Sequence, residues 1–187
     1  MRIIAGSLGG RELGRVPEGV RPTTDRVRES LFAALGSVEG CRVLDLFAGS
    51  GALGLEAFSR GAKRVVFVDR SRRVVQALRR LLERFDLAGQ PDIRVLCLAA
   101  GRAIRRLAAA GERFDLVFVD PPYATEDREA VLEALFASGI LEPEATVVVE
   151  GPKRHPLPPL PGFRVVDERR YGDTLLSWLA PASSPGE

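Results

Sequence analysis

The part of the chain that most restricts its fold is residues 43–54, an apolar run with one acid in it, followed by closely spaced glycines. Residues 43–46 are typical of a buried strand, and Gly49, Gly51 and Gly54 form the pattern G-x-G-x-x-G. Glycines in this pattern allow positive φ and let a ligand approach the backbone closely. The turn opens onto a helix N-terminus, whose free N–H groups face that ligand. The stretch therefore predicts a strand, a ligand-binding turn and a helix.

The acid Asp45 indicates which cofactor this turn accepts. A dinucleotide would bring an anionic pyrophosphate close to a carboxylate, and the two would repel each other in a low-dielectric site. S-adenosylmethionine (SAM) carries an ammonium and a sulfonium, so Asp45 can accept a hydrogen bond from the ammonium. Asp69 follows Gly49 by the interval at which an acid holds ribose hydroxyls, which either cofactor would use. The acid favours SAM; the alternative is an ordinary strand–turn–helix with a stray acid, which is costly to bury without a partner.

Length and composition exclude several classes of protein. The chain has 187 residues, 45% of them hydrophobic, which suits one domain with a sizeable core. The net charge is only +2, so any surface for nucleic acid has to be local. Cys41 and Cys97 lie in or beside apolar runs, which disfavours a disulfide framework and favours a reducing cytoplasm. No apolar run approaches the roughly 20 residues of a membrane span, and the first residues lack the apolar region of a signal peptide.

Strand and helix patterns alternate along the rest of the chain. Further strands are predicted at residues 64–69, 93–98, 114–120, 145–150, 163–171 and 174–179, and helices at 71–85, 99–110 and 126–138. The alternation predicts a parallel sheet covered on both faces, with ligands at the C-terminal ends of the strands, where Asp45, Asp69 and Asp120 fall. The arginines of the helix at 71–85 are typical of a solvated exterior. His155, in a proline-rich connection, is expected to be an exposed loop residue.

The first 40 residues predict an extension rich in arginine. Residues 2–5 and 11–14 favour a glycine-rich hairpin, and Thr23 or Thr24 can serve as the N-cap of the helix that follows. Between residues 1 and 28 there are six arginines against three acids. Because arginine pairs phosphates bidentately, this segment is a candidate contact for nucleic acid, with an ordinary solvated surface as the alternative.

The second chemical feature is Asp120-Pro121-Pro122-Tyr123. The prolines stiffen the loop that leaves the strand. The Asp120 carboxylate and the Pro121 carbonyl are two hydrogen-bond acceptors, and Tyr123 offers a flat face for a base. Two acceptors beside a stacking ring suit an exocyclic amine on a nucleobase, because drawing its protons aside lets the nitrogen become pyramidal and attack. In-line positioning against an activated methyl can then supply much of the acceleration.

These motifs carry a family resemblance. Residues 45–54 resemble the SAM motif of class I methyltransferases, and residues 120–123 resemble the [D/N]-P-P-[F/Y/W] motif of amino-group nucleic-acid methyltransferases. Residues 21–32, RPTTDRVRESLF, and 47–57, FAGSGALGLEA, closely resemble the RsmD family of 16S rRNA guanine-N2 methyltransferases. The resemblance spans nearly the whole chain. It implies methyl transfer from SAM to the N2 amine of one guanine in small-subunit rRNA.

The resemblance also implies an α/β, Rossmann-like fold: a seven-stranded, mostly parallel sheet with the last strand antiparallel, plus an N-terminal β-hairpin and helix. We expect one methyltransferase domain over residues 1–187. Its parts would be the extension (1–40), the SAM-binding catalytic core (41–180) and a tail (181–187).

Site residues follow from the resemblance by position. Those expected to hold SAM lie in the turn and at the next two strand ends: Asp45, Phe47, Ala48, Gly49, Ser50, Gly51, Asp69, Arg70, Ala99 and Ala100. Asp120, Pro121 and Tyr123 would hold the guanine for catalysis. The further substrate contacts would be Arg21, Thr23, Thr24, Arg26, Arg28 and Pro122, and no metal is expected. Related enzymes often have Asp or Asn where this chain has Ala99, so adenine recognition would rest on backbone groups around Ala99 and Ala100.

Other functions remain as alternatives. An adenine-N6 methyltransferase acting on DNA or RNA would use the same chemistry, although 187 residues leave no room for a DNA target-recognition domain. Cytosine-C5 transfer would need a cysteine at the active edge. A NAD-dependent oxidoreductase is disfavoured by Asp45, and a non-enzymatic RNA-binding module would leave the strand-end acids unexplained. We expect a cytoplasmic monomer that acts on 16S rRNA in an assembling 30S particle.

Overall fold

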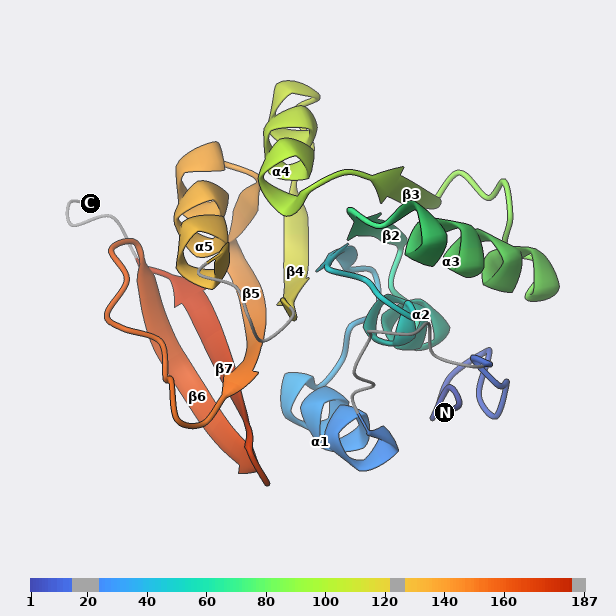
Figure 1. The fold of residues 1–187 in the computed structure, drawn as a ribbon, viewed down its shortest axis with the longest axis horizontal. Coiled ribbons are helices and arrows are strands. Elements are labelled where there is room, and N and C mark those ends of the chain that lie inside the picture. Colours follow the sequence, from blue (N-terminus) through green and yellow to red (C-terminus); the bar gives the residue numbers. More distant parts are fainter. Residues whose placement is uncertain (15–23, 122–126, 183–187) are drawn as a thin grey trace.

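One sheet forms the centre of the computed structural model, which describes residues 1–14, 24–121 and 127–182 (Figure 1). Its strands are β1 (Arg42–Leu46), β2 (Arg64–Asp69), β3 (Ile93–Cys97), β4 (Phe114–Val119), β5 (Leu141–Pro152), β6 (Phe163–Tyr171) and β7 (Thr174–Pro181). The helices are α1 (Asp25–Leu35), α2 (Ala52–Ser59), α3 (Arg72–Arg84), α4 (Ala100–Ala109) and α5 (Asp127–Ser138).

The seven strands lie in the order β3-β2-β1-β4-β5-β7-β6. Strands β1 to β5 pair in parallel, whereas β7 is antiparallel to both β5 and β6. The predicted sheet, mostly parallel with its last strand antiparallel, is therefore confirmed. The chain runs from β1 outward to β3 and then returns to place β4 on the other side of β1. Ligands of such sheets bind at the strand ends beside this reversal, here between β1 and β4.

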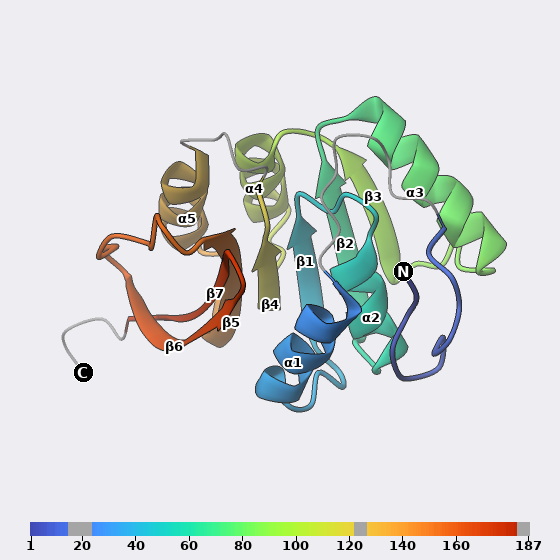
Figure 2. The ribbon, with the colours of Figure 1, turned by 60° about the horizontal axis from the view of Figure 1, so that its bottom comes forward.

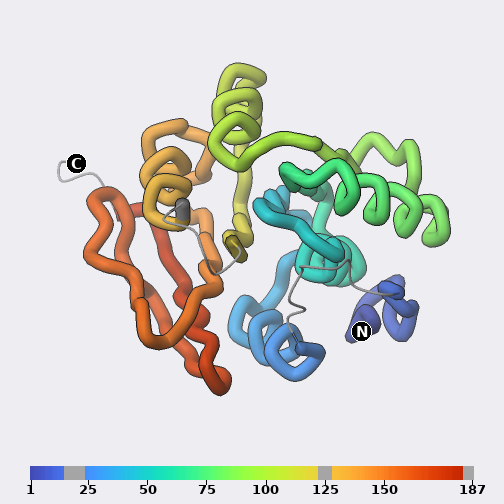
Figure 3. The backbone as a smooth tube through the Cα atoms, viewed as in Figure 1, coloured from blue at the N-terminus to red at the C-terminus, as the bar shows by residue number. Residues whose placement is uncertain are grey.

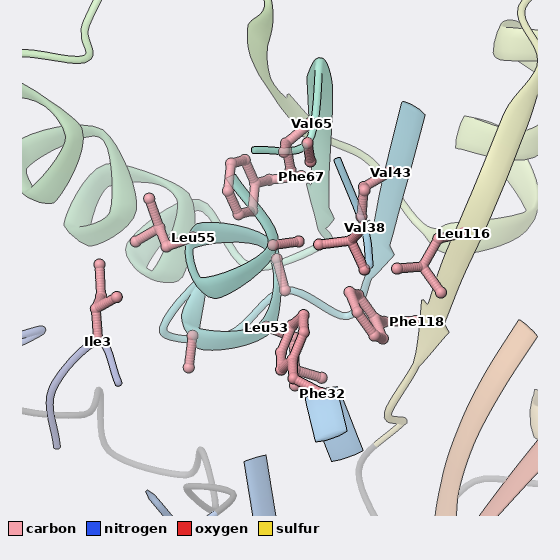
Figure 4. Packing of buried hydrophobic residues seen from close by; sticks show 14 of the residues in the cluster. Ile3, Phe32, Val38, Val43, Leu53, Leu55, Val65, Phe67, Leu116 and Phe118 are labelled. Carbon is pink, nitrogen blue, oxygen red and sulfur yellow. The ribbon is translucent and has the colours of Figure 1, made fainter. Parts of the chain in front are cut away.

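Two apolar clusters cover the two faces of the sheet. Phe67 and Phe118 point to the face covered by α1, α2 and α3, where Phe32 lies 5.9 Å from Phe118 between ring centroids (Figure 4). Leu44 and Leu46, next to them in the pleat, point to the face covered by α4 and α5. Because residues 43–46 of β1 are buried on both faces, they are apolar apart from Asp45.

Helix boundaries agree closely with the sequence patterns. Thr24 is the N-cap of α1 and accepts a hydrogen bond from the Val27 N–H, and Ser71 caps α3 in the same way. The strand predicted at 145–150 is longer than expected. It begins at Leu141, which pairs with Phe114 before an irregularity in the register, and so the sheet extends further than the apolar run.

The N-terminal segment is less regular than the predicted hairpin. Its strands are reduced to a single antiparallel bridge between Arg2 and Glu12. Over residues 1–14 the segment forms no long ladder of backbone hydrogen bonds. Its side chains Ile3, Leu8 and Leu13 are buried against the rest of the protein. It lies beside α2 and α3, at the end of the molecule opposite to β6 (Figure 3). Cys41 and Cys97 are free, and His155 is exposed as predicted. No helix in the described ranges is long and apolar enough to cross a membrane.

Candidate active site

The glycine turn connects β1 to α2. Phe47 has a φ of +65°, unusual for an aromatic residue, and Gly51 has a φ of +75° at the position that precedes α2. The Gly51 N–H donates to the Ala48 carbonyl at 2.7 Å, which closes the turn. A Cβ on Gly54 would lie 2.3 Å from Cε1 of Phe67. The third glycine therefore allows α2 to pack closely on β2, rather than making room for a ligand.

Asp45 lies beneath this turn and is only 2% exposed. Its Oδ2 accepts a hydrogen bond from the Gly54 N–H at 3.0 Å. Burial raises the pKa of Asp45 to about 7; the hydrogen bond from Gly54 opposes this shift, and the nearby Asp69 carboxylate adds to it. The side chain is turned toward α2, and its contact with the ammonium of SAM stays a prediction. Its observed contact is with the start of α2.

Asp69, at the end of β2, is better placed to meet a ligand. Its Oδ2 accepts from the Gly49 N–H at 3.1 Å and its Oδ1 from the Ser71 N–H at 2.8 Å. The side chain thus joins the glycine turn to the start of α3, and it is only half-buried. Each carboxylate oxygen has a further lone pair, so Asp69 can also accept from ribose hydroxyls. Arg70, beside it, is exposed.

The adenine side of the predicted site lies at the start of α4. Ala99 is exposed and occupies the N-cap position, with no side-chain hydrogen bond to the helix. Ala100 behind it is buried. The Leu98 N–H donates to the Asp69 carbonyl at 3.0 Å, which brings this segment next to the end of β2. The structure therefore brings Asp69 and Ala99 to the same edge of the sheet.

The second motif begins beside the first. Leu46 pairs with Val119 in the parallel register of β1 and β4, so the next residues, Phe47 and Asp120, leave neighbouring strands at the same edge. Asp120 and Pro121 are half-buried. The predicted residues Pro122 and Tyr123 lie outside the described part of the chain.

Some of the predicted substrate contacts in the N-terminal region are exposed, and one is buried. Thr24 and Arg26 are exposed at the start of α1, whereas Arg28 is fully buried. Its Nη2 donates to the Arg2 carbonyl at 2.5 Å and to Oδ1 of Asp25 at 2.7 Å. Arg28 is therefore turned into the protein and is not presented to RNA, which corrects the prediction for that residue. Arg21 and Thr23 lie outside the described residues.

Sequence reasoning missed Glu56 on α2. It is fully buried, and its carboxylate accepts from the backbone N–H groups of Ile4 at 2.7 Å and Ala5 at 3.1 Å. Nε of Arg60 also donates to it, at 2.7 Å. The available signal was a lone acid in an otherwise apolar helix, since a charge at such a position has to be paired.

The residues at this edge suit SAM. Phe47, Ala48, Gly49, Ser50 and Gly51 form a backbone turn beside a half-buried carboxylate, Asp69. A backbone turn and a strand-end acid fit an adenosyl group and an amino acid. Among the described side chains, no group of three or more His, Cys, Asp or Glu could hold a metal ion.

The parallel sheet with one antiparallel strand, the glycine turn after β1 and the acid after β2 define a class I methyltransferase fold. A solved structure from Escherichia coli, "Putative methyltransferase yhhF", superposes with a TM-score of 0.83 at 36% identity over 97% of each chain. The model of the family described as "Conserved hypothetical protein 95" matches residues 1–180.

Two curated relatives match over most of their length. "Ribosomal RNA small subunit methyltransferase D" of Escherichia coli K12 is 41% identical over 190 residues, which cover 100% of this chain and 92% of the relative. "Putative rRNA methyltransferase YlbH" of Bacillus subtilis is 38% identical over 177 residues, or 93% and 95% of the two chains. The chain therefore belongs to this family, the RsmD family, as the motifs predicted.

Proposed function

We propose that this protein transfers a methyl group from SAM to the exocyclic N2 amine of one guanine in 16S rRNA. The observation that carries the proposal is the pairing of Leu46 with Val119, because it sets the turn beginning at Phe47 beside Asp120. In this proposal, the binding site for the methyl donor and the binding site for the amine follow adjacent strands. The small-subunit substrate is supported by the name of the Escherichia coli relative.

In this proposal the turn, residues 47–51, holds the amino-acid end of SAM, and Asp69 holds its ribose. Asp45 supports the turn from below through the Gly54 N–H. When bound, SAM supplies a methyl group on a sulfonium, which is already a good electrophile. The chain has to orient that group and does not need a strong base to activate it.

The acceptors at the end of β4 would prepare the amine. The Asp120 carboxylate and the Pro121 carbonyl each accept one N–H of the guanine N2 amine, and Tyr123 stacks on the base. These hydrogen bonds draw the two protons out of conjugation and leave the nitrogen lone pair directed at the methyl. After transfer the nitrogen carries one proton too many, and Asp120 can accept it. Because a base in folded RNA is not accessible, the guanine has to leave its stack to reach this site.

The preferred substrate in this proposal is an assembling 30S particle. The net charge of +2 is modest for a protein that binds naked RNA through phosphates alone, so additional contacts with the particle are expected. We also propose that the protein acts as a monomer in the cytoplasm. A light-scattering mass twice that of the 20.3 kDa chain would contradict the monomer.

The test is methyl transfer from labelled SAM to 30S particles that lack the modification, with naked 16S rRNA and DNA as comparisons, followed by mapping of the product. We expect N2-methylguanine at one position of 16S rRNA. N6-methyladenine would overturn the guanine assignment in favour of the adenine-N6 alternative, and an absence of SAM binding would overturn the methyltransferase proposal as a whole.

Asp120→Ala tests the role of the acceptor. We expect at least about a 100-fold loss of transfer with little change in SAM affinity, as for a group that acts mainly on the transferring amine. Asp115→Ala is the matched control, in the strand that Asp120 directly follows. Asp115 lies at the opposite end of β4 and pairs with Arg42 at 2.9 Å, so its loss should leave transfer unchanged. Equal transfer by the two variants would contradict the assignment of Asp120.

A further inference from the structure

Helix α3 has an outward face that is strongly basic. It carries five arginines and one glutamate over 13 residues, while its buried residues, among them Val74, Leu78 and Leu81, face the sheet. The five arginines are all exposed: Arg72, Arg73, Arg79, Arg80 and Arg84. Since the whole chain carries only +2, the charge on this helix is offset by an acidic balance elsewhere. Helix α3 by itself therefore carries more positive charge than the chain as a whole.

Two of these arginines occupy positions that cost the helix stability. Arg72 and Arg73 open the first turn of α3, which contains no acid. The N-terminus of a helix carries the positive end of its dipole, so cations there are unfavourable by some tenths of a kcal/mol. A solvated exterior does not need cations at these positions, whereas a surface that binds anions gains from them.

The N-terminal segment lies beside the C-terminal end of α3 (Figure 2). Nη1 of Arg11 donates to the Phe85 carbonyl at 3.1 Å, and Nη2 of Arg84 donates to the Glu12 carbonyl at 2.7 Å. The guanidinium carbons of both arginines lie over the Phe85 ring, 5.3 and 5.6 Å from its centroid. Backbone acceptors hold both side chains without neutralising their charge.

Some arginines elsewhere in the described residues are paired with acids. Arg42 pairs with Asp115 and Glu142, and Arg60 pairs with Glu56. By contrast, the side chains of Arg72, Arg79 and Arg80 make no hydrogen bond or ion pair with any described residue. Their charges are available to an external anion.

We propose that the outer face of α3, with Arg11 at its far end, binds the phosphate backbone of 16S rRNA. This proposal rests on the proposed function and adds a second contact, separate from the seat of the target base. The helix spans about 20 Å, enough to meet several phosphates of one strand. Its first turn begins next to Asp69, so the face extends outward from the cofactor side of the sheet. RNA held there would be anchored while its target guanine reaches the end of β4.

The test is the variant Arg72→Gln/Arg79→Gln/Arg80→Gln in the full chain. We expect at least about a 10-fold rise in the Kd for naked 16S rRNA transcript and a fall of about 2 in the slope of log K against log salt. SAM affinity and kcat at saturating RNA should be unchanged. The lysine version of the same three changes keeps the charge and should retain most of the affinity.

The matched control is Arg102→Gln/Arg105→Gln/Arg106→Gln on α4. It removes the same charge from exposed positions on the helix that covers the opposite face of the sheet. We expect its Kd to stay within about 2-fold of the unsubstituted protein. If the two triple variants weaken RNA binding equally, the effect comes from net charge alone and the proposal is overturned.

Two further outcomes distinguish a failure of this RNA-binding surface from a failure of the proposed function. If α3 substitution weakens binding to 30S particles but not to naked rRNA, the face contacts ribosomal protein and the assignment to RNA is wrong. If the unsubstituted protein methylates RNA while the single reversal Arg79→Glu leaves RNA affinity unchanged, the docking surface fails and the proposed function stands. That single exposed substitution also provides a test if the triple variant does not fold.

Discussion

Arg28 and Glu56 face each other in the interior, with Nη1 of Arg28 3.6 Å from Oε2 of Glu56 and neither side chain exposed. Arg28 belongs to α1 and Glu56 to α2, and Glu56 also accepts the backbone N–H groups of Ile4 and Ala5. One carboxylate thus ties two helices and the N-terminal segment together. Since α2 begins at the glycine turn, this pair fixes the outer elements to the candidate cofactor site.

We expect Glu56→Gln to destabilise the protein by about 3 kcal/mol, because it leaves the buried Arg28 charge with only the half-exposed Asp25 as a counterion. Urea unfolding measures the loss. Glu142→Gln is the control, since Glu142 pairs with Arg42 at 2.6 Å but both side chains are about a third exposed, and its removal should cost less than about 1 kcal/mol. Similar losses for the two variants would contradict the structural role of Glu56.

Asp45 should make stability depend on pH near neutrality. Its pKa in the folded protein is about 7, above its ordinary value of 3.8, so between these values the folded state binds the proton more tightly than the unfolded state. Stability from this group is thus full below about pH 4 and falls as pH rises toward 7, by up to about 4 kcal/mol in total. Asp45→Asn removes the titration and keeps an acceptor for the Gly54 N–H.

Urea unfolding at several pH values between 4 and 8 compares the two proteins. As pH rises through this window, the free energy of unfolding of the unsubstituted protein should fall relative to that of Asp45→Asn. Above about pH 8 the difference between the two free energies should be constant. A difference that stays constant throughout the window would show that Asp45 is ionised in the folded state at all these pH values.

Gly54→Ala should damage the glycine turn. The added Cβ would lie 2.3 Å from Phe67 Cε1 and 3.0 Å from Asp45 Oδ2, so either α2 or the Phe67 ring has to move. We expect a loss of about 2–3 kcal/mol in stability together with weaker SAM binding, measured by thermal unfolding and calorimetry.

Gly101→Ala provides the matched control in the first turn of another helix. A Cβ there would meet only Nη1 of Arg105, at 3.8 Å, and alanine favours a helix over glycine by about 0.5–1 kcal/mol. Gly101→Ala should therefore be neutral or stabilising. If both alanines had the same effect, close packing at Gly54 would not be the cause.

Ala99→Asp should improve both α4 and the adenine site. An N-cap carboxylate accepts the uncapped backbone N–H groups of α4, worth about 1 kcal/mol, and it also offers an acceptor to the adenine amine. We expect a higher melting temperature and tighter SAM binding. Ala99→Ser caps the helix with a shorter side chain and should raise the melting temperature alone. Equal SAM affinities for the two variants would argue against an adenine contact at this position.

The local elements of this protein follow from its sequence because their causes are local. The apolar spacing from Val74 to Leu82 is enough to predict α3, and Gly49 and Gly51 mark the turn before α2. The alternation of these elements predicts the parallel sheet, since parallel strands need helical crossovers. The family resemblance supplied the antiparallel orientation of the last strand relative to the parallel strands.

The directions of individual side chains were decided by contacts between distant parts of the chain. The positive charge of SAM favoured Asp45 as an acceptor for the ammonium, and the family resemblance favoured Arg28 as a substrate contact. Tertiary packing turned both inward, because Glu56 offers Arg28 a buried counterion and Gly54 offers Asp45 a backbone donor. A motif can show which residues lie at an edge of the sheet, but the free energy of burial decides which of them face the ligand and which support the turn from within.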